Sequence, residues 1–241
     1  MAYRITPSCI APTRINKVDR DNITVIILAA NIGYGMKSYG PKTLLNVNET
    51  ETLLEHQISL IRIVYPRADI ILVVGFLSER IIRKCPPGIR IVENQLYEHT
   101  NEATQLRLAL NCTLTDNVLI IKDDIVFNED TLADISKDKS CIIYDSKGQI
   151  DSDNIGATIV DGYATTFAFE MPDKWCHIVY LVQKELKILR TLCNNKEHNR
   201  MYLFELLKIM LDRIDKIKAI EPTNMEIIKI DNSRDLNKLR T

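Results

Sequence analysis

Three glycines follow an apolar run within eight consecutive positions, a spacing that suits a loop that binds phosphate. Gly33, Gly35 and Gly40 are three of the 8 glycines in the 241 residues. Glycine lets backbone N–H groups come close to a phosphate, and Lys42 adds a positive charge just after Gly40. For the glycines alone, a flexible connection that binds nothing is the alternative.

Two known phosphate-loop patterns fit this segment only in part. Gly35 and Gly40 have the spacing of G-x-x-x-x-G-K-[ST], but a proline separates the second glycine from the lysine. Proline has no N–H to donate and disfavours the helix that should start there. Gly33 and Gly35 fit the start of G-x-G-x-x-G, but Ser38 takes the third glycine position. Neither pattern identifies the class of loop.

Aspartates end two later apolar runs. Asp123 and Asp124 end V-L-I-I-K-D-D, and Asp231 ends I-I-K-I-D. Mg²⁺ is usually held by one or two carboxylates together with substrate phosphates. Asp124 and Asp231 are therefore predicted to hold Mg²⁺, and for the adjacent pair a solvated turn is the alternative. A polar segment from Glu93 to Asn101 is either helix-capping chemistry or a rim that faces a ligand.

The elements that must position these residues are buried strands alternating with helices. Continuous apolar, β-branched runs predict strands at 24–30, 68–75, 89–94 and 117–124, and near-helical spacing predicts helices at 51–64, 78–84 and 101–111. Thr50 or Thr52 is expected to cap the first helix. This order predicts a Rossmann-like, mainly parallel α/β sandwich with right-handed crossovers. Ligands bind at the carboxyl ends of such strands, where Lys42, Asp124 and Asp231 would meet.

The second half of the chain has a different texture. Short strands are expected within 141–170, with antiparallel pairing, followed by helices at 174–193 and 200–217. Residues 225–231 predict a last strand and 233–240 a terminal helix. Residues 1–21 predict an N-terminal arm, a candidate for assembly into a homo-oligomer, ahead of one domain at 22–241.

Composition excludes several classes. The 46% apolar and 26% charged residues are ordinary values for a folded protein, and the formal net charge of -1 argues against nucleic acid or a membrane surface as partner. The 6 cysteines have no metal-ligand spacing, and no apolar stretch is long enough for a membrane span or a secretory signal. A cytoplasmic location is expected.

One long segment resembles the signature of a known family. V-I-I-L-A-A-N-I-G-Y-G-M-K-S-Y-G-P-K-T-L-L-N-V is similar to L-A-A-G-x-G-x-R-M followed by P-K-x-L-L-x-V, the opening of the sugar-nucleotidyltransferase family. The likeness continues through E-N-Q-L-Y-E-H-T-N, L-I-I-K-D-D-I-V-F and I-K-I-D-N-S-R-D-L, and covers roughly residues 23–240. The most similar branch holds the small cytidylyltransferases that activate phosphocholine or sugar phosphates.

The resemblance implies a GT-A-like Rossmann fold and a reaction in which an NTP, CTP favoured, and a phosphorylated sugar or alcohol give an NDP-linked product and pyrophosphate. It implies catalytic roles for Lys42, which would contact phosphate, and Asp124, and a Mg²⁺ site at Asp124 and Asp231. The implied nucleotide-binding residues are Ala29, Ala30, Asn31, Gly33, Gly35, Lys37 and Asn101.

The chain departs from the family pattern at three places. Asn31 stands where the first glycine is usual, Gly35 stands where the family has an arginine, and Gln105 stands where many relatives carry serine. Lys37 is the candidate substitute for the arginine. These departures motivate a second hypothesis, a nucleotide binder or assembly component without catalysis. A third, a GT-A glycosyltransferase, rests on Asp123 and Asp124 imitating a D-x-D metal site.

Overall fold

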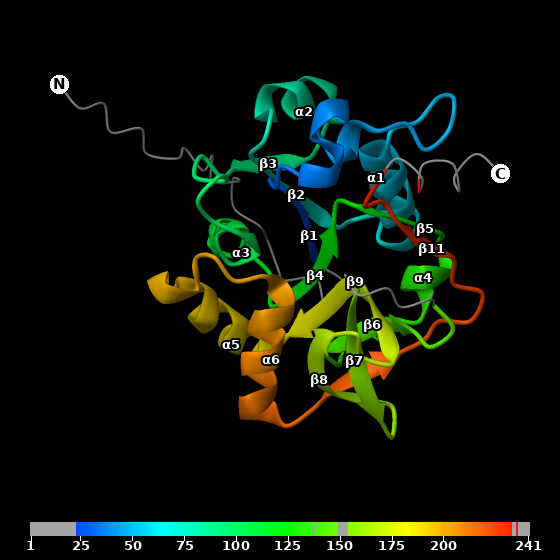
Figure 1. Ribbon diagram of the computed structural model, residues 1–241, viewed down its shortest axis with the longest axis vertical. Helices are drawn as coiled ribbons and strands as arrows, with labels where there is room; N and C mark the ends of the chain where they lie inside the picture. The colour runs from blue at the N-terminus through cyan, green and yellow to red at the C-terminus, as the bar shows by residue number, and fades with distance from the viewer. Residues whose placement is uncertain (1–22, 137, 149–153, 233–234, 236–241) are drawn as a thin grey trace.

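β1 (Thr24–Ala29) is an inner strand of the parallel half of a large sheet, and Figure 1 shows the computed structural model. The structure describes residues 23–136, 138–148, 154–232 and 235. The predicted arm at 1–21 and the predicted helix at 233–240, except Asp235, lie outside these residues.

Four strands in this half confirm the predicted parallel pairing. β1 lies between β2 (Asp69–Val74) and β4 (Asn117–Lys122), and β3 (Arg90–Glu93) pairs with the outer side of β2. β1 is buried along its whole length, as its continuous apolar run predicts. Leu28 is paired with Lys122, so the loop after β1 begins beside the end of β4.

The other half of the sheet is mixed, which corrects the prediction of a mainly parallel sheet. Within the described residues the nine-stranded order is β3-β2-β1-β4-β9-β6-β10-β8-β7. β9 is antiparallel to both β4 and β6, β10 is parallel to β6, and β8 is antiparallel to both β10 and β7. The bounds are β6 Cys141–Asp145, β7 Ile155–Val160, β8 Tyr163–Phe169, β9 Asp173–Val182 and β10 Ile217–Ile220.

The predicted helix at 174–193 is wrong in its first half. Residues 174–182 belong to β9, and only α5 (Gln183–Asn194) is helical. W-C-H-I-V-Y-L-V is continuously buried between β4 and β6, and a short apolar run of this kind has no periodicity that separates strand from helix. The helix predicted at 200–217 is α6 (Leu203–Ile214), and its last predicted residue begins β10.

Helices cover both faces of the sheet (Figure 1). α3 (Glu102–Leu110), α5 and α6 pack on the face that carries Ile26 and Leu28. α1 (Leu53–Val64), α2 (Ser78–Lys84) and α4 (Asp130–Ala133) pack on the face that carries Val25 and Ile27. The remaining helical turns are the 3₁₀ segments η1 Tyr34–Tyr39, η2 Lys42–Leu44 and η3 Lys196–His198. None of the helices in the described part of the chain combines the length and apolarity of a membrane span.

The predicted last strand is not in the main sheet. β11 (Ile227–Lys229) pairs antiparallel with β5 (Ile125–Phe127) in a separate two-stranded sheet. β5 follows β4 after a two-residue turn, and Lys229 is paired with Ile125. The N–H of Ile230 donates to the carbonyl of Asp124 at 2.7 Å. The end of β11 is therefore fixed to the end of β4 although the two strands belong to different sheets.

Candidate active site

The loop after β1 takes a shape that only glycine adopts readily. Gly33 and Gly40 flank η1 with φ of 60° and 89°, in the left-handed region where other residues are strained. A Cβ built on Gly33 would lie 3.0 Å from Cε of Lys42, so the missing side chain leaves room for the lysine to cross the loop. Lys42 itself begins η2 directly after Pro41. The long helix of a G-x-x-x-x-G-K-[ST] loop is absent at this point.

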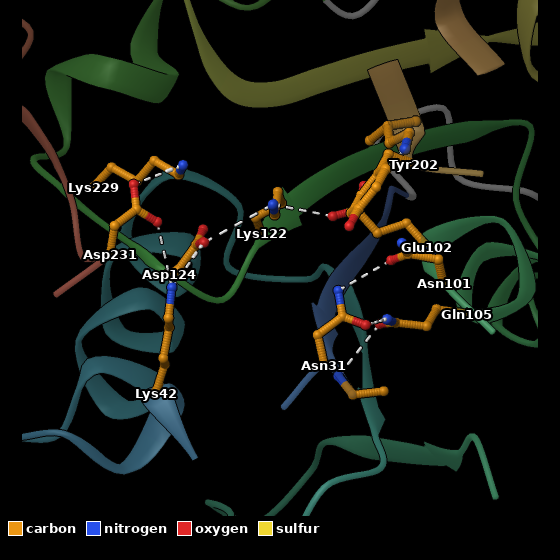
Figure 2. A network of polar contacts seen from close by, with 12 residues as sticks. Asn31, Lys42, Asn101, Glu102, Gln105, Lys122, Asp124, Tyr202, Lys229 and Asp231 are labelled. Carbon is orange, nitrogen blue, oxygen red and sulfur yellow. Dashed lines mark hydrogen bonds and ion pairs between the residues drawn. The ribbon is translucent and has the colours of Figure 1, made fainter. Parts of the chain in front are cut away.

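Lys42 and the two predicted metal ligands converge at this edge of the sheet. The Lys42 ammonium lies 3.4 Å from Oδ2 of Asp124 and 3.5 Å from Oδ1 of Asp231. The left side of Figure 2 shows these side chains pointing toward one another. Lys229 approaches the other oxygen of Asp231, at 2.7 Å. Asp124 is buried, whereas the Asp231 side chain is 44% exposed. The structure thus brings together three residues that are far apart in the chain.

A buried ion pair continues the network away from Asp124. The Lys122 ammonium lies 3.9 Å from Oδ2 of Asp124 and 3.0 Å from Oε1 of Glu102, the first residue of α3. The Glu102 side chain is only 3% exposed, and its Oε2 accepts from the N–H of Leu203 at the start of α6. Lys122 therefore joins the end of β4 to the starts of two helices.

The charges in this network strongly perturb one another. Burial alone would raise the pKa of Asp124, but Lys122 and Lys42 outweigh it and hold that pKa well below its usual range. Burial and the adjacent charge of Asp124 raise the pKa of Asp123. Burial opposes the charged form of Lys42 as well, but Asp124, Asp123 and Asp231 together outweigh it and raise the lysine pKa. At neutral pH, Asp124 is ionised and both lysines carry a proton.

Neutral amides make up the other side of the site, on the right of Figure 2. Oδ1 of Asn31 accepts from Nε2 of Gln105 at 2.8 Å, and Nδ2 of Asn31 donates to Oδ1 of Asn101 at 3.4 Å. The N–H of Ala30 donates to Oε1 of Gln105 at 3.3 Å. Asn101 also caps α3 by accepting from the N–H of Glu102 at 3.0 Å. Two positions that depart from the family pattern, Asn31 and Gln105, are thus partners of each other.

We call these two groups the carboxylate half and the amide half. The carboxylate half consists of Lys42, Lys122, Asp124, Lys229 and Asp231. The amide half consists of Ala30, Asn31, Asn101 and Gln105.

The remaining residues predicted to contact the nucleotide make no side-chain hydrogen bond or ion pair with this polar network in the described structure. Ala29 is buried at the end of β1. Gly35 lies exposed, and a Cβ built on it would lie 3.0 Å from the carbonyl oxygen of Asp231. Lys37 is also exposed in η1, and within the described residues no ion pair links it to the carboxylates. The role of Lys37 as a substitute for the arginine stays a prediction.

The donor set is suited to a hard cation that also takes ligands from a substrate. No group of three or more His, Cys, Asp or Glu side chains that could enclose a metal occurs in the described ranges. Asp124 and Asp231 supply carboxylate oxygens, and Oδ1 of Asp124 is buried without a hydrogen-bond partner in the described structure. Mg²⁺ is commonly held by one or two carboxylates and phosphate oxygens, so these residues fit that ion.

Sequence reasoning missed several polar residues here. Lys122 and Lys229 each precede an aspartate by two positions, and alternate residues of an extended chain point to the same side. That repeated K-x-D spacing was the available signal. Glu102 gave none, because an acidic residue in the first turn of a helix is common. His177, expected at a helix start, lies buried in β9 with a φ of 58°. Burial holds its pKa well below the usual range.

One pocket in the described part of the chain lies away from these residues. It has a volume of about 280 Å³ and is lined by Ser140, Val182, Ile217 and neighbouring residues. Val182 is paired with Asn117, the first residue of β4, so the pocket is at the opposite end of that strand from Asp124. It shares no lining residue with the carboxylate half or the amide half.

Comparison with solved structures identifies the fold. The structure is similar to CTP:phosphocholine cytidylyltransferase from Streptococcus pneumoniae, with a TM-score of 0.73 and 20% sequence identity over 90% of this chain and 97% of that chain. The inositol-1-phosphate CTP transferase from T. maritima gives 0.72 and 14% over 90% and 96%. The chain has the fold of these nucleotidyltransferases. A putative glucose-1-phosphate thymidylyltransferase from Bacillus anthracis gives 0.70 and 15% over 90% and 93%.

Comparisons that use the sequence alone give no match. No family model and no curated protein matches the chain. The fold implied by the sequence motifs is confirmed, since these similar structures all carry nucleotidyltransferase names.

Proposed function

We propose that the protein is a nucleotidyltransferase that joins the NMP part of an NTP to a phosphorylated sugar or alcohol and releases pyrophosphate. The observation that carries this proposal is the convergence of Lys42, Asp124 and Asp231 at 3.4 and 3.5 Å, beside a glycine loop at the carboxyl end of β1. The fold shared with three nucleotidyltransferases supports it. CTP is the favoured nucleotide, because two of those structures are named as CTP-using enzymes.

The residues divide the work by their charge. A phosphate oxygen of the acceptor attacks the α-phosphorus of the NTP, the bond from that phosphorus to the bridging oxygen breaks, and pyrophosphate leaves with the electron pair. The Lys42 ammonium binds phosphate oxygens and stabilises the charge that develops on them. Asp124 and Asp231 would hold Mg²⁺, which when bound supplies further positive charge at the phosphates. Catalysis then consists mainly of positioning and charge neutralisation.

The amide half is suited to hold the nucleoside. Ala29 and Ala30 lie at the end of β1 and have no bulky side chain that would cover the backbone. Asn31 and Asn101 carry neutral hydrogen-bond donors and acceptors. Gly33 and Gly35 leave the loop backbone free of side chains on the phosphate side. The amides of Asn31 and Asn101 offer hydrogen bonds but carry no charge, so they suit the sugar or the base of the nucleotide better than its phosphates.

A direct assay tests this proposal. The purified protein is mixed with each NTP in turn, Mg²⁺, and a panel of sugar phosphates, inositol phosphate and phosphocholine. We expect pyrophosphate release with at least one pair, strongest with CTP. Absence of release with every pair would overturn the proposal.

One observation favours a second candidate, a nucleotide-binding protein without catalysis. Gly35 occupies the position of the family's arginine, and its neighbour in space is the Asp231 carbonyl rather than a cation. Calorimetry with each NTP and Mg²⁺ separates the two functions. Binding without pyrophosphate release supports this candidate, whereas release with any substrate pair contradicts it.

A further inference from the structure

Two strands in the carboxylate half end in the same short pattern. β4 ends in Lys122, followed two residues later by Asp124, and β11 ends in Lys229, followed two residues later by Asp231. Each lysine pairs with its own aspartate, at 3.9 Å and 2.7 Å respectively. Both aspartates also pair with Lys42. Each carboxylate is therefore shared between Lys42 and the lysine two residues before it.

The two lysines differ in how firmly they are held. Lys122 is fixed by Glu102 at 3.0 Å, and that carboxylate is almost completely buried. The partner of Lys229 is Asp231, which is far more exposed and is shared with Lys42. A partly exposed ion pair contributes little to stability, so Lys229 can exchange its partner at small cost.

The segment that carries Lys229 and Asp231 packs beside the glycine loop. Ile230 is fully buried against Met36 of η1 and Leu45, and its N–H is bonded to Asp124. Alternate residues of a strand point to opposite sides, so this packing directs Lys229 and Asp231 away from the apolar cluster and toward the site. The carbonyl of Asp231 lies 3.0 Å from a Cβ built on Gly35. The backbone of Asp231, whose side chain pairs with Lys229, thus lies beside Gly35.

We propose that Lys229 binds the polyphosphate chain of the substrate nucleotide and supplies, from β11, the positive charge that the loop lacks at Gly35. This inference rests on the proposed function. Once a cation occupies Asp124 and Asp231, the carboxylates no longer need the ammonium groups of Lys42 and Lys229. Those two ammonium groups then face the phosphates, which are the strongest acceptors present.

The test measures binding of inorganic tripolyphosphate by calorimetry in excess Mg²⁺, with the full-length protein. We expect the wild-type protein to bind and Lys229→Met to bind on the order of 10-fold or more weakly, the usual effect of one charge-assisted hydrogen bond. Lys229→Arg should keep most of the affinity, because it keeps the charge. Lys187→Met, at an exposed lysine of α5, should bind as the wild type does.

Two results would overturn the role of Lys229. One is equal affinity of Lys229→Met and the wild type, and the other is no binding by the wild type. Circular dichroism and thermal unfolding of each variant establish that it is folded, and Lys229→Arg provides a second variant that keeps the ion pair with Asp231.

The same variants separate this inference from the proposed function. Pyrophosphate release that is unchanged in Lys229→Met would retain the transferase and reject the phosphate role of Lys229. Tripolyphosphate binding that depends on Lys229, together with no pyrophosphate release from any substrate pair, would retain the phosphate site and reject the transferase.

Discussion

The carboxylate half and the amide half lie at the same edge of the sheet but hold their polar groups by different forces. In the carboxylate half, Lys42 and Lys229 pair with carboxylates at 2.7 to 3.5 Å, and Asp231 is open to solvent. In the amide half, Gln105 is completely buried and neutral groups satisfy one another. The first arrangement is poised to change partners when charged ligands arrive, and the second is a fixed frame. Only the first should therefore be required for the chemical step.

The largest expected effect is on catalysis, from Asp124→Asn. Loss of this charge removes a proposed Mg²⁺ ligand and the partner of Lys42 and Lys122, so we expect pyrophosphate release to fall by about 10³-fold. The matched control is Asp116→Asn, an exposed aspartate just before the other end of β4. A steady-state assay of both variants measures the effect. An equal loss of activity in both variants would contradict a specific role for Asp124 in the reaction.

Glu102→Gln tests the link between the two halves. It leaves the Lys122 charge without its nearest partner in a buried position, so we expect a loss of about 3 kcal/mol in the free energy of unfolding. Urea unfolding measures it. Glu79→Gln, which breaks an exposed pair with Arg83 at 3.8 Å, is the control and should leave the stability unchanged. A stable Glu102→Gln protein would contradict the assigned burial of this ion pair.

Asn31→Gly restores the residue usual in the family but should not improve the protein. It removes the acceptor of a buried Gln105 amide, so we expect a loss of about 1–3 kcal/mol in stability. Gln105→Ser in addition should recover part of this loss, with a coupling of at least about 0.5 kcal/mol in a double-mutant cycle. Strict additivity would show that the two amides act independently.

The smallest effect is expected at a carboxylate outside both halves. Thr52 donates to Glu55 through its N–H at 2.8 Å and its hydroxyl at 2.7 Å, and these bonds lower the pKa of Glu55. A lowered pKa stabilises the fold above the pKa of the unfolded chain, and this contribution is lost as pH falls through the folded pKa. The midpoint temperature of thermal unfolding of Glu55→Gln should therefore be slightly below that of the wild type at pH 7 and equal to it in acid. A difference in midpoint temperature that grows in acid would contradict the lowered pKa of Glu55.

Particular residues show how far the sequence could lead. The strand β1 and the helix at Ser78–Lys84 follow from local patterns, and the structure has them as predicted apart from one residue at the end of β1. β9 was missed because a run buried on both faces has no distinguishing period, and its place between β4 and β6 depends on tertiary packing. That strand makes the sheet mixed.

The site could be anticipated only where strand ends carry charge. Asp124 and Asp231 follow apolar runs and Lys42 follows the glycine loop, so their convergence was predictable even though β11 lies outside the main sheet. The pairing of Asn31 with Gln105 joins residues 74 positions apart, and no local pattern reports such a contact. What first counted as two departures from the family pattern is, in the structure, one hydrogen-bonded pair.

The most direct test of the proposed transferase is the identity of the product. The wild-type protein and Asp124→Asn are incubated with CTP, Mg²⁺ and each phosphorylated acceptor, and pyrophosphate and the nucleotide product are quantified by mass spectrometry. We predict equal amounts of pyrophosphate and a CDP-linked product with the wild type, and about 10³-fold less of both with the variant. No CDP-linked product with any acceptor, or the same amount from the variant, would contradict the proposal.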